Sequence, residues 1–350
     1  MFKRAAFYLI ILAFLFLLGV PAAKAQIAPD IFTGSLSTTL SPSIPSANSS
    51  VTATVENYAI DLGRSTITWN TSDGQTSSGL GLRTFIFSTP AVGQTQTVSV
   101  RVVGSNGKTY EDSITLTPGA VDLLVEADTY TPPLYKGRSL FTPQSLVTIA
   151  AIPDIRTGGT KISSKELVYT WEKNGQVLQQ ASGVGKDTIS FVGNLAPTPF
   201  FVTVVVETVN GGVQAQKRIE VTPKNTSVLV YESNPLFGNL FERAITSRFR
   251  FDREEVGLVA IPYFFSASSR DDASIEYSWT ENEKPIDLPT LGSKLTFTNR
   301  GKAKSGISRI NVGTNHLSNI LQDAKINFAL DVVGDETLEN ELQTGNVTVF

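Results

Sequence analysis

The sequence predicts an all-β protein, a tandem array of three β-sandwich domains that follows a signal peptide. Three observations support this prediction. The chain has 350 residues, which is too long for one ordinary hydrophobic core. Thr, Ser, Val and Gly recur throughout, and this composition favours strands and turns. The three Trp residues stand 102 and 108 residues apart, about the length of one sandwich domain.

The N-terminus has the three parts of a secretory signal. A positive start, Lys3 and Arg4, precedes an apolar stretch at residues 5–20 and an A-x-A cleavage motif at residues 23–25. We therefore expect cleavage before Gln26 and an extracellular or cell-surface location. The alternative is an uncleaved membrane anchor, although the apolar stretch is shorter than the roughly 20 residues of a membrane span. No second stretch of that length follows, so the mature chain is expected to carry no integral membrane segment.

Charge and cysteine content narrow the class of partner. The chain has no Cys, so each domain must rely on its own core without a disulfide. Removing the signal takes away Lys3, Arg4 and Lys24 and no acidic residue, which changes the net charge from −3 to −6. An acidic chain argues against nucleic acid and anionic membrane surfaces as partners.

Each Trp is followed by the same landmarks in the same order. The first is a strand of strictly alternating apolar residues, predicted at 97–102, 202–206 and 325–332. A turn rich in Gly with Asn or Asp follows, at 106–107, 210–212 and 334–335. A closing strand is predicted last, at 114–116, 219–221 and 347–349, and a Thr-Pro pair ends the first two. These patterns predict domains at 26–119, 120–223 and 224–350.

The first repeat carries a more specific motif. Asp73-Gly74 follows Trp69 by four and five residues, and residues 96–117 then have an alternating Val strand, an Asn-Gly hairpin and a closing strand. In these features the repeat resembles a PKD domain, an immunoglobulin-like sandwich that is common in extracellular proteins. The second and third repeats keep the Trp and the strand pattern without the Asp-Gly. The resemblance implies immunoglobulin-like sandwiches that serve in extracellular spacing, adhesion or protein contact.

The Trp residues are predicted to be structural. Trp69, Trp171 and Trp279 each lie two residues after an aromatic or apolar residue, at a shared place in the repeat. A sandwich keeps its core Trp at that place. The alternative is an exposed platform on which sugars stack, and we expect the core position instead.

No pattern in the sequence indicates a catalytic, metal or cofactor site. His316 is the single His, its segment reads as a loop, and no G-x-S-x-G motif accompanies a Ser. The Gly183–Thr188 segment lacks the first Gly of a phosphate-binding loop and precedes a predicted strand. The acidic clusters lack the D-x-D-x-D-G spacing of a calcium loop, and calcium binding by them stays open; they lie at 252–255, 271–272 and 335–336. We expect a non-catalytic protein without a cofactor.

The third repeat departs from the second, and we expect a partner contact where it does. Between Pro235 and Ala260 lie seven more residues than between Pro133 and Ala151. The extra length falls in residues 239–255, where apolar residues suit one face of a short helix; these are Leu240, Phe241, Ala244 and Ile245. The alternative is that this helix covers an open sheet edge or braces the joint with the second domain.

A second departure is predicted after Trp279. The gap to Ile326 is 47 residues, against 31 residues from Trp171 to Val202, and it holds a basic stretch at residues 300–309. Phe and Arg are enriched at protein interfaces, and insertions on a rigid fold often carry binding. The predicted contact residues are Phe241, Arg248, Phe249, Arg250, Phe251, Lys302 and Lys304.

Together these features predict a non-catalytic exported protein. It would act as a spacer, adhesion or protein-interaction module, for example within a cell-surface appendage. Its partner would be a protein or an envelope polymer. The alternative is a carbohydrate-binding or accessory module of a secreted hydrolase system.

Overall fold

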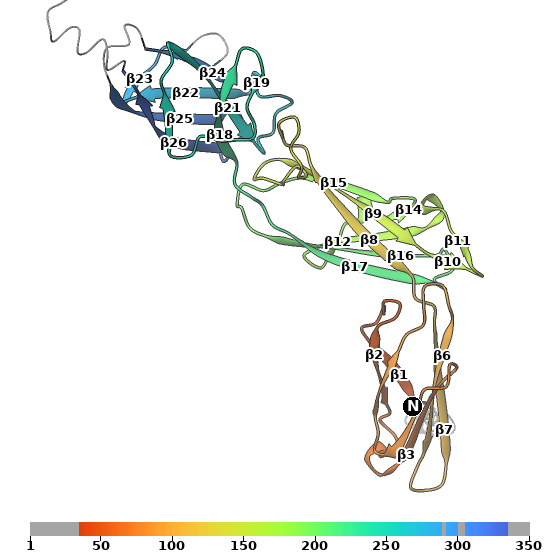
Figure 1. Cartoon of the computed structure of the whole chain (residues 1–350). Coiled ribbons are helices and arrows are strands. Elements are labelled where there is room, and N and C mark those ends of the chain that lie inside the picture. The colour runs from red at the N-terminus through yellow and green to blue at the C-terminus, as the bar shows by residue number, and fades with distance from the viewer. Residues whose placement is uncertain (1–34, 289–291, 300–304, 335–350) are drawn as a thin grey trace, which may run out of the picture. The chain divides into compact units, whose positions relative to one another are not determined.

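The computed structural model describes residues 35–288, 292–299 and 305–334, and in these residues the protein is all-β (Figure 1). Strands and three short 3₁₀ turns make up the regular structure of this part of the chain, which contains no α-helix. The predicted signal peptide and the predicted closing strand at 347–349 lie outside it. Among the described residues, no helix is long and apolar enough to cross a membrane.

The chain divides into two compact units. One is built around Thr52–Phe87 and Thr97–Ile114 and forms the first sandwich, and the other runs from Thr115 onward and contains two sandwiches. The boundaries predicted near residues 120 and 224 fall just before β8 (Ala120–Ala127) and β18 (Ser227–Asn234), which open the second and third sandwiches.

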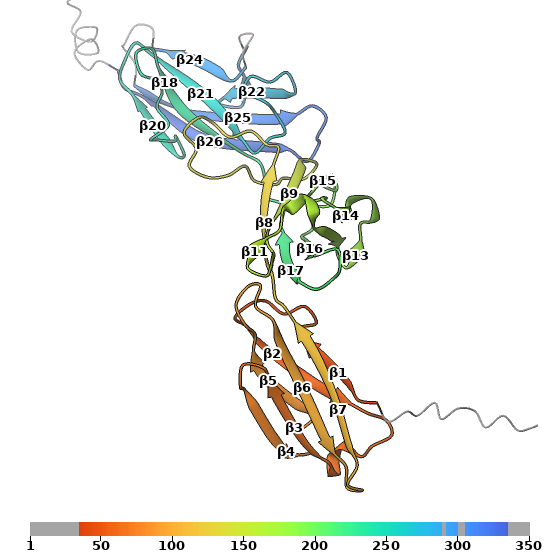
Figure 2. The same ribbon diagram turned by 90° about the vertical axis from the view of Figure 1, so that its right-hand side faces the viewer.

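The first sandwich packs a three-stranded sheet on a four-stranded sheet (Figure 2). The smaller sheet has the order β1 (Ser37–Ser41), β2 (Ser50–Glu56) and β5 (Thr84–Ser88). The larger sheet has the order β4 (Thr76–Leu80), β3 (Thr66–Thr71), β6 (Gln96–Val103) and β7 (Thr109–Leu116).

The second sandwich repeats this plan. One sheet has the order β15 (Thr188–Val192), β9 (Leu146–Asp154) and β8. The other has the order β13 (Gln176–Val177), β12 (Val168–Lys173), β16 (Phe200–Glu207) and β17 (Gln214–Val221), and β14 (Gly183–Val184) also pairs with β12. A small separate hairpin joins β10 (Arg156–Thr157) to β11 (Thr160–Lys161).

The third sandwich has one more strand in each layer. One sheet has the order β19 (Gly238–Asn239), β18, β21 (Glu255–Tyr263) and β24 (Lys294–Thr298). The other has the order β20 (Arg248–Phe251), β26 (Asp323–Val332), β25 (Gly306–His316), β22 (Ile275–Glu281) and β23 (Lys284–Pro285). This second layer is called the five-stranded sheet below.

The three Trp side chains lie in the cores and have their polar atom satisfied. Trp69, Trp171 and Trp279 are each at most 1% exposed. Each indole N–H donates to a backbone carbonyl oxygen, at 3.0 Å to Leu82, 2.8 Å to Lys186 and 2.9 Å to Gly292. A buried Trp that also has a hydrogen-bond partner is stable in a core, and these three rings are not available to stack sugars.

The register around the Trp residues corrects the alignment of the third repeat. Trp69 lies opposite Val100, Trp171 opposite Val204 and Trp279 opposite Val312. The third strand of this type is therefore β25, and the prediction that residues 325–332 correspond to it was wrong. Those residues form the next strand, β26. The spacing from Trp to the opposite Val is 33 residues in both the second and third repeats, so the second predicted departure does not exist.

The predicted helix in residues 239–255 was also wrong. This segment contains turns, a single bridge between Ile245 and Val230, and β20. The strand β20 pairs in parallel with β26, with Phe251 opposite Val332. Alternation of Phe and Arg with period two suits a strand, and edge pairing on β26 outweighed the helical spacing that precedes it. The segment covers the edge of the five-stranded sheet, as the alternative interpretation held.

Candidate functional site

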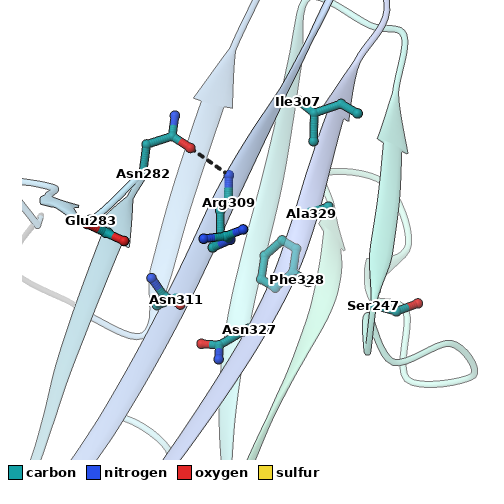
Figure 3. A pocket seen from close by; sticks show the side chains of 9 residues that line it. All are labelled: Ser247, Asn282, Glu283, Ile307, Arg309, Asn311, Asn327, Phe328 and Ala329. Atoms are coloured by element: carbon teal, nitrogen blue, oxygen red, sulfur yellow. Dashed lines mark hydrogen bonds between the residues drawn. The ribbon is translucent and has the colours of Figure 1, made fainter.

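A hollow of about 810 Å³ lies on the outer face of the five-stranded sheet (Figure 3). Its walls come from β25, β26, the turn between β22 and β23, and the residue before β20. The lining residues are Ser247, Asn282, Glu283, Ile307, Arg309, Asn311, Asn327, Phe328 and Ala329. Most of these side chains are polar, and we refer to this place as the Arg309 hollow.

Strand alternation places the polar side chains on this face. Arg309 and Asn311 of β25 point outward, whereas Ile310 and Val312 between and beyond them are fully buried. In the register of the sheet Arg309 lies opposite Ala329, and Asn311 lies opposite Asn327. The small side chain of Ala329 leaves space beside the long side chain of Arg309, which is why the face is hollowed there.

A strained turn forms the rim of the hollow. Asn282 and Glu283 join β22 to β23, and both have positive φ values, 47° and 70°. The corresponding turn of the second sandwich uses Asn174 and Gly175, at 51° and 79°. Two positive φ values are typical of a type I′ hairpin, for which Asn-Gly is the preferred pair. The third sandwich keeps the turn but replaces its Gly with Glu, and a non-Gly residue in this conformation is disfavoured.

The turn is also tied to β25. The side-chain oxygen of Asn282 accepts a hydrogen bond of 2.9 Å from the backbone N–H of Arg309, and the Asn282 N–H donates to the Arg309 carbonyl at 2.9 Å. Figure 3 shows the first of these bonds and the position of Glu283 beside it. Strain that the surrounding structure holds in place is typical of functional sites. We therefore take this rim to be part of the candidate site.

Replacing Glu283 with Gly is expected to stabilise the third sandwich by about 1 kcal/mol, because Gly adopts positive φ without the steric cost of a side chain. The measurement is chemical denaturation of the mature protein. The Glu283→Ala variant is the control, since it removes the carboxylate but keeps the strained backbone. If Ala stabilises as much as Gly, the effect comes from charge and the backbone is not strained.

Positive charge gathers around the hollow. Arg248 and Arg250 of β20 lie opposite Ala329 and Asp331 of β26, so they share the outer face with Arg309. Arg248 lies 3.8 Å from the Asp331 carboxylate and is 60% exposed. Within the described residues, no ion pair includes Arg250 or Arg309. The protein as a whole is acidic, so this face differs in charge from the rest of the chain.

The predicted contact residues do not all lie on this face. Phe251 is 1% exposed in the core, and Phe249 packs against the same core. The ring of Phe241 lies edge-on to Tyr231, with centroids 5.3 Å apart. The contact role predicted for these three Phe residues was wrong, because their rings are used inside the molecule. Arg248 and Arg250 lie exposed on the outer face, and Lys302 and Lys304 fall outside the described residues.

Sequence reasoning missed most of the Arg309 hollow. Asn282, Glu283, Asn311 and Asn327 were not singled out. The available signal was the alternation of Arg309 and Asn311 with buried Ile310 and Val312. It was overlooked because the strand opposite Trp279 had been assigned to residues 325–332.

The remaining candidates from the sequence have structural roles. His316 accepts hydrogen bonds at Nδ1 from the backbone N–H groups of Ser318 and Asn319, and its Nε2 lies 3.0 Å from the Ser266 carbonyl oxygen. The ring therefore organises the turn between β25 and β26. Gly185 adopts a positive φ of 68° in a turn between strands, as expected of a hairpin.

The acidic pair Asp271-Asp272 is also engaged in loop structure. The hydrogen bond from Arg270 holds the pKa of Asp271 below its usual range. Asp272 accepts hydrogen bonds from Ser268 and Ser274, which hold the pKa of its carboxyl far below its usual range. Among the residues that the structure describes, no group of three His, Asp or Glu side chains could hold a metal ion.

No protein-family model and no curated protein matches this sequence. Among solved structures, the chain is similar to the three N-terminal domains of the bacteriophage RB49 Highly Immunogenic Outer Capsid protein, with 12% identity, a TM-score of 0.23, and coverage of 85% of this chain and 98% of that one. It is similar to the central fibronectin-III array of RIM-binding protein, at 13% identity and TM-score 0.29, over 85% of this chain and 96% of that one.

A third similar structure is Bacteroides ovatus SGBP-B, of a mixed-linkage glucan utilization locus, in complex with a mixed-linkage heptasaccharide. The identity is 13% and the TM-score 0.22, over 82% of this chain and 63% of that one. Likeness at this level carries no argument about function. The fold of this protein rests on its own strand order and buried Trp residues: it is a tandem array of immunoglobulin-like sandwiches.

Proposed function

We propose that the mature protein is a non-catalytic exported spacer and interaction module that binds its partner through the Arg309 hollow. The observation that carries this proposal is the gathering of Arg248, Arg250 and Arg309 on one hollowed sheet face of an acidic chain. Export rests on the signal sequence in residues 1–25 and the extracellular role on the PKD-like motif of the first repeat, and both are part of the proposal.

The chemistry of the face favours an anionic envelope polymer as the partner. A guanidinium group that has no carboxylate beside it can donate paired hydrogen bonds to a carboxylate or phosphate. The amides of Asn282, Asn311 and Asn327 add donors and acceptors at fixed positions on two strands and a turn. A repeating acidic polymer would meet several of these groups at once.

A second candidate is a neutral carbohydrate, as in an accessory module of a hydrolase system. The three amides that line the hollow favour it, because they can bond to sugar hydroxyls. However, Phe328 is the one aromatic residue among the lining residues, and it is only 3% exposed. The described part of the hollow thus offers no aromatic platform on which a sugar ring could stack. We favour the anionic partner for this reason.

Replacing Arg309 with Glu is expected to weaken binding to envelope polymer at least about tenfold, since a hydrogen bond to a charged group contributes roughly 1.5–3 kcal/mol. The measurement is retention of the mature protein on purified envelope polymer over a range of salt concentrations, and binding should fall as salt rises.

The matched control is Arg101→Glu. Arg101 lies on β6, the first-sandwich strand that pairs with the Trp strand as β25 does in the third. Equal retention of the Arg309 and Arg101 variants would contradict the proposed role of the hollow. Binding that is insensitive to salt and selects neutral glycans would favour the second candidate.

A further inference from the structure

The second sandwich docks on the third through the loop between its first two strands. This loop covers residues 128–145, between β8 and β9. The backbone of Tyr130 makes two hydrogen bonds to the third sandwich: its N–H donates to the Phe265 carbonyl at 2.7 Å, and its carbonyl accepts from the Phe264 N–H at 2.8 Å. The loop is thereby fixed on the segment that follows β21.

An aromatic residue at the tip of the loop completes this contact. Tyr135, in the sequence Pro133-Leu134-Tyr135, places its ring edge-on to Tyr263 and Phe264, with centroid distances of 5.9 Å and 5.8 Å. Edge-to-face aromatic contacts of this kind stabilise packing beyond the area that they bury. The joint shows how one sandwich of this family of repeats receives the sandwich before it.

The third sandwich carries the same element without a partner in the described chain. Pro235-Leu236-Phe237 occupies the corresponding place, at the start of the segment between β18 and β21. Leu236 is 87% exposed and Phe237 is 78% exposed, whereas Tyr135 is 38% exposed. The side chain of Asn234 accepts hydrogen bonds from the N–H groups of both, at 2.9 Å and 3.1 Å, so the tip is held in a defined shape. Two adjacent large apolar side chains on an ordered turn are typical of a contact surface.

The first sandwich carries the receiving position, also exposed. Tyr263 follows the inward-facing Ala260 of β21 by three residues, and Tyr58 follows the inward-facing Val55 of β2 by three residues. In the second sandwich the same position is the polar Asp154. Tyr58 is 89% exposed, whereas Tyr263, which receives Tyr135, is 8% exposed.

We infer that the Leu236–Phe237 tip of one molecule docks on Tyr58 of a second copy of this chain. The tip lies where a sandwich meets the domain after it, and Tyr58 lies where a sandwich meets the domain before it, so the two surfaces are complementary in position as well as in chemistry. The contact joins different surfaces of the two copies, and such a contact repeats from copy to copy in a head-to-tail chain. It does not involve the Arg309 hollow and is independent of the proposed function.

The test is sedimentation velocity of the mature protein at rising concentration. Because the patch is small, association is expected to be weak and to require up to about 1 mM protein. Wild-type protein should form dimers and longer species. Phe237→Asp and Tyr58→Asp should each remain monomeric, and the control Leu195→Asp, at a 60% exposed leucine of the second sandwich, should associate like the wild type.

Mixing the two variants gives the decisive result. Each variant retains the surface that the other has lost, so an equimolar mixture of Phe237→Asp and Tyr58→Asp should form dimers and nothing longer. The inference is overturned if the wild type stays monomeric, or if Tyr58→Asp associates normally while Phe237→Asp does not, which would mean that two tips meet each other. It is also overturned if the mixture stays monomeric or if Leu195→Asp is equally impaired.

Discussion

Replacing Trp171 with Ala is expected to lower the free energy of unfolding of the second sandwich by about 3–5 kcal/mol, the usual cost of removing a large buried aromatic side chain. The ring is fully buried among the residues of the second core, and Val204 lies opposite it in the sheet. Truncation leaves a cavity between the two sheets and also leaves the Lys186 carbonyl oxygen without the 2.8 Å hydrogen bond from the indole.

The measurement is hydrogen exchange of the backbone amides of β12 and β16 in the mature protein, which reports the opening of this sandwich by itself. The matched control is Val192→Ala, because Val192 is 60% exposed on β15 of the same sandwich. It should change the free energy by about 0.5 kcal/mol or less. A loss below about 1 kcal/mol for Trp171→Ala would mean that the ring is not a core residue in solution.

Replacing Gln322 with Ala is expected to cost about 2–4 kcal/mol and to separate the unfolding of the second and third sandwiches, since buried polar groups lose their partners. Gln322 is 1% exposed, and its side-chain oxygen accepts a 2.8 Å hydrogen bond from the Ser266 N–H. Its side-chain nitrogen donates to the Pro143 carbonyl at 2.8 Å. One residue thus links the turn after β25 to the docking loop of the second sandwich.

Scanning calorimetry of the mature protein checks this prediction. The wild type should show the second and third sandwiches unfolding together, and Gln322→Ala should show two transitions. The control is Gln214→Ala, which removes a hydrogen bond of 2.7 Å to Glu207 on the surface of the second sandwich, away from this network. An unchanged thermogram for Gln322→Ala would show that the network does not couple the two sandwiches.

These two predictions concern different levels of the architecture. Trp171 stabilises one sandwich from inside, and its role follows from a motif that occurs once in each repeat. Gln322 stabilises the joint, together with Thr142, whose hydroxyl donates at 3.0 Å to the Phe264 carbonyl. The second and third sandwiches therefore belong to one compact unit, although each has its own core. The spacing of repeats could not indicate how strongly neighbours are joined.

The sequence by itself determined the fold class and the core. Period-two alternation places apolar side chains on one face of each strand, and this local property holds whatever the strand pairs with. The recurrence of one Trp in about 100 residues likewise marked each core, because an immunoglobulin-like sandwich holds its large aromatic residue at a fixed place. These predictions needed no knowledge of which strands are neighbours.

Only the tertiary structure decided the register of the third sandwich and the candidate site. Residues 306–316 and 323–332 both form strands with alternating burial, and pairing with Trp279 alone shows that the first of them lies opposite it. Arg248 and Arg309 are distant in sequence, and they share a face because β20 pairs in parallel with β26 and β26 pairs with β25. Hydrogen bonding between strands distant in sequence depends on which edges are open, and local periodicity carries no information about that.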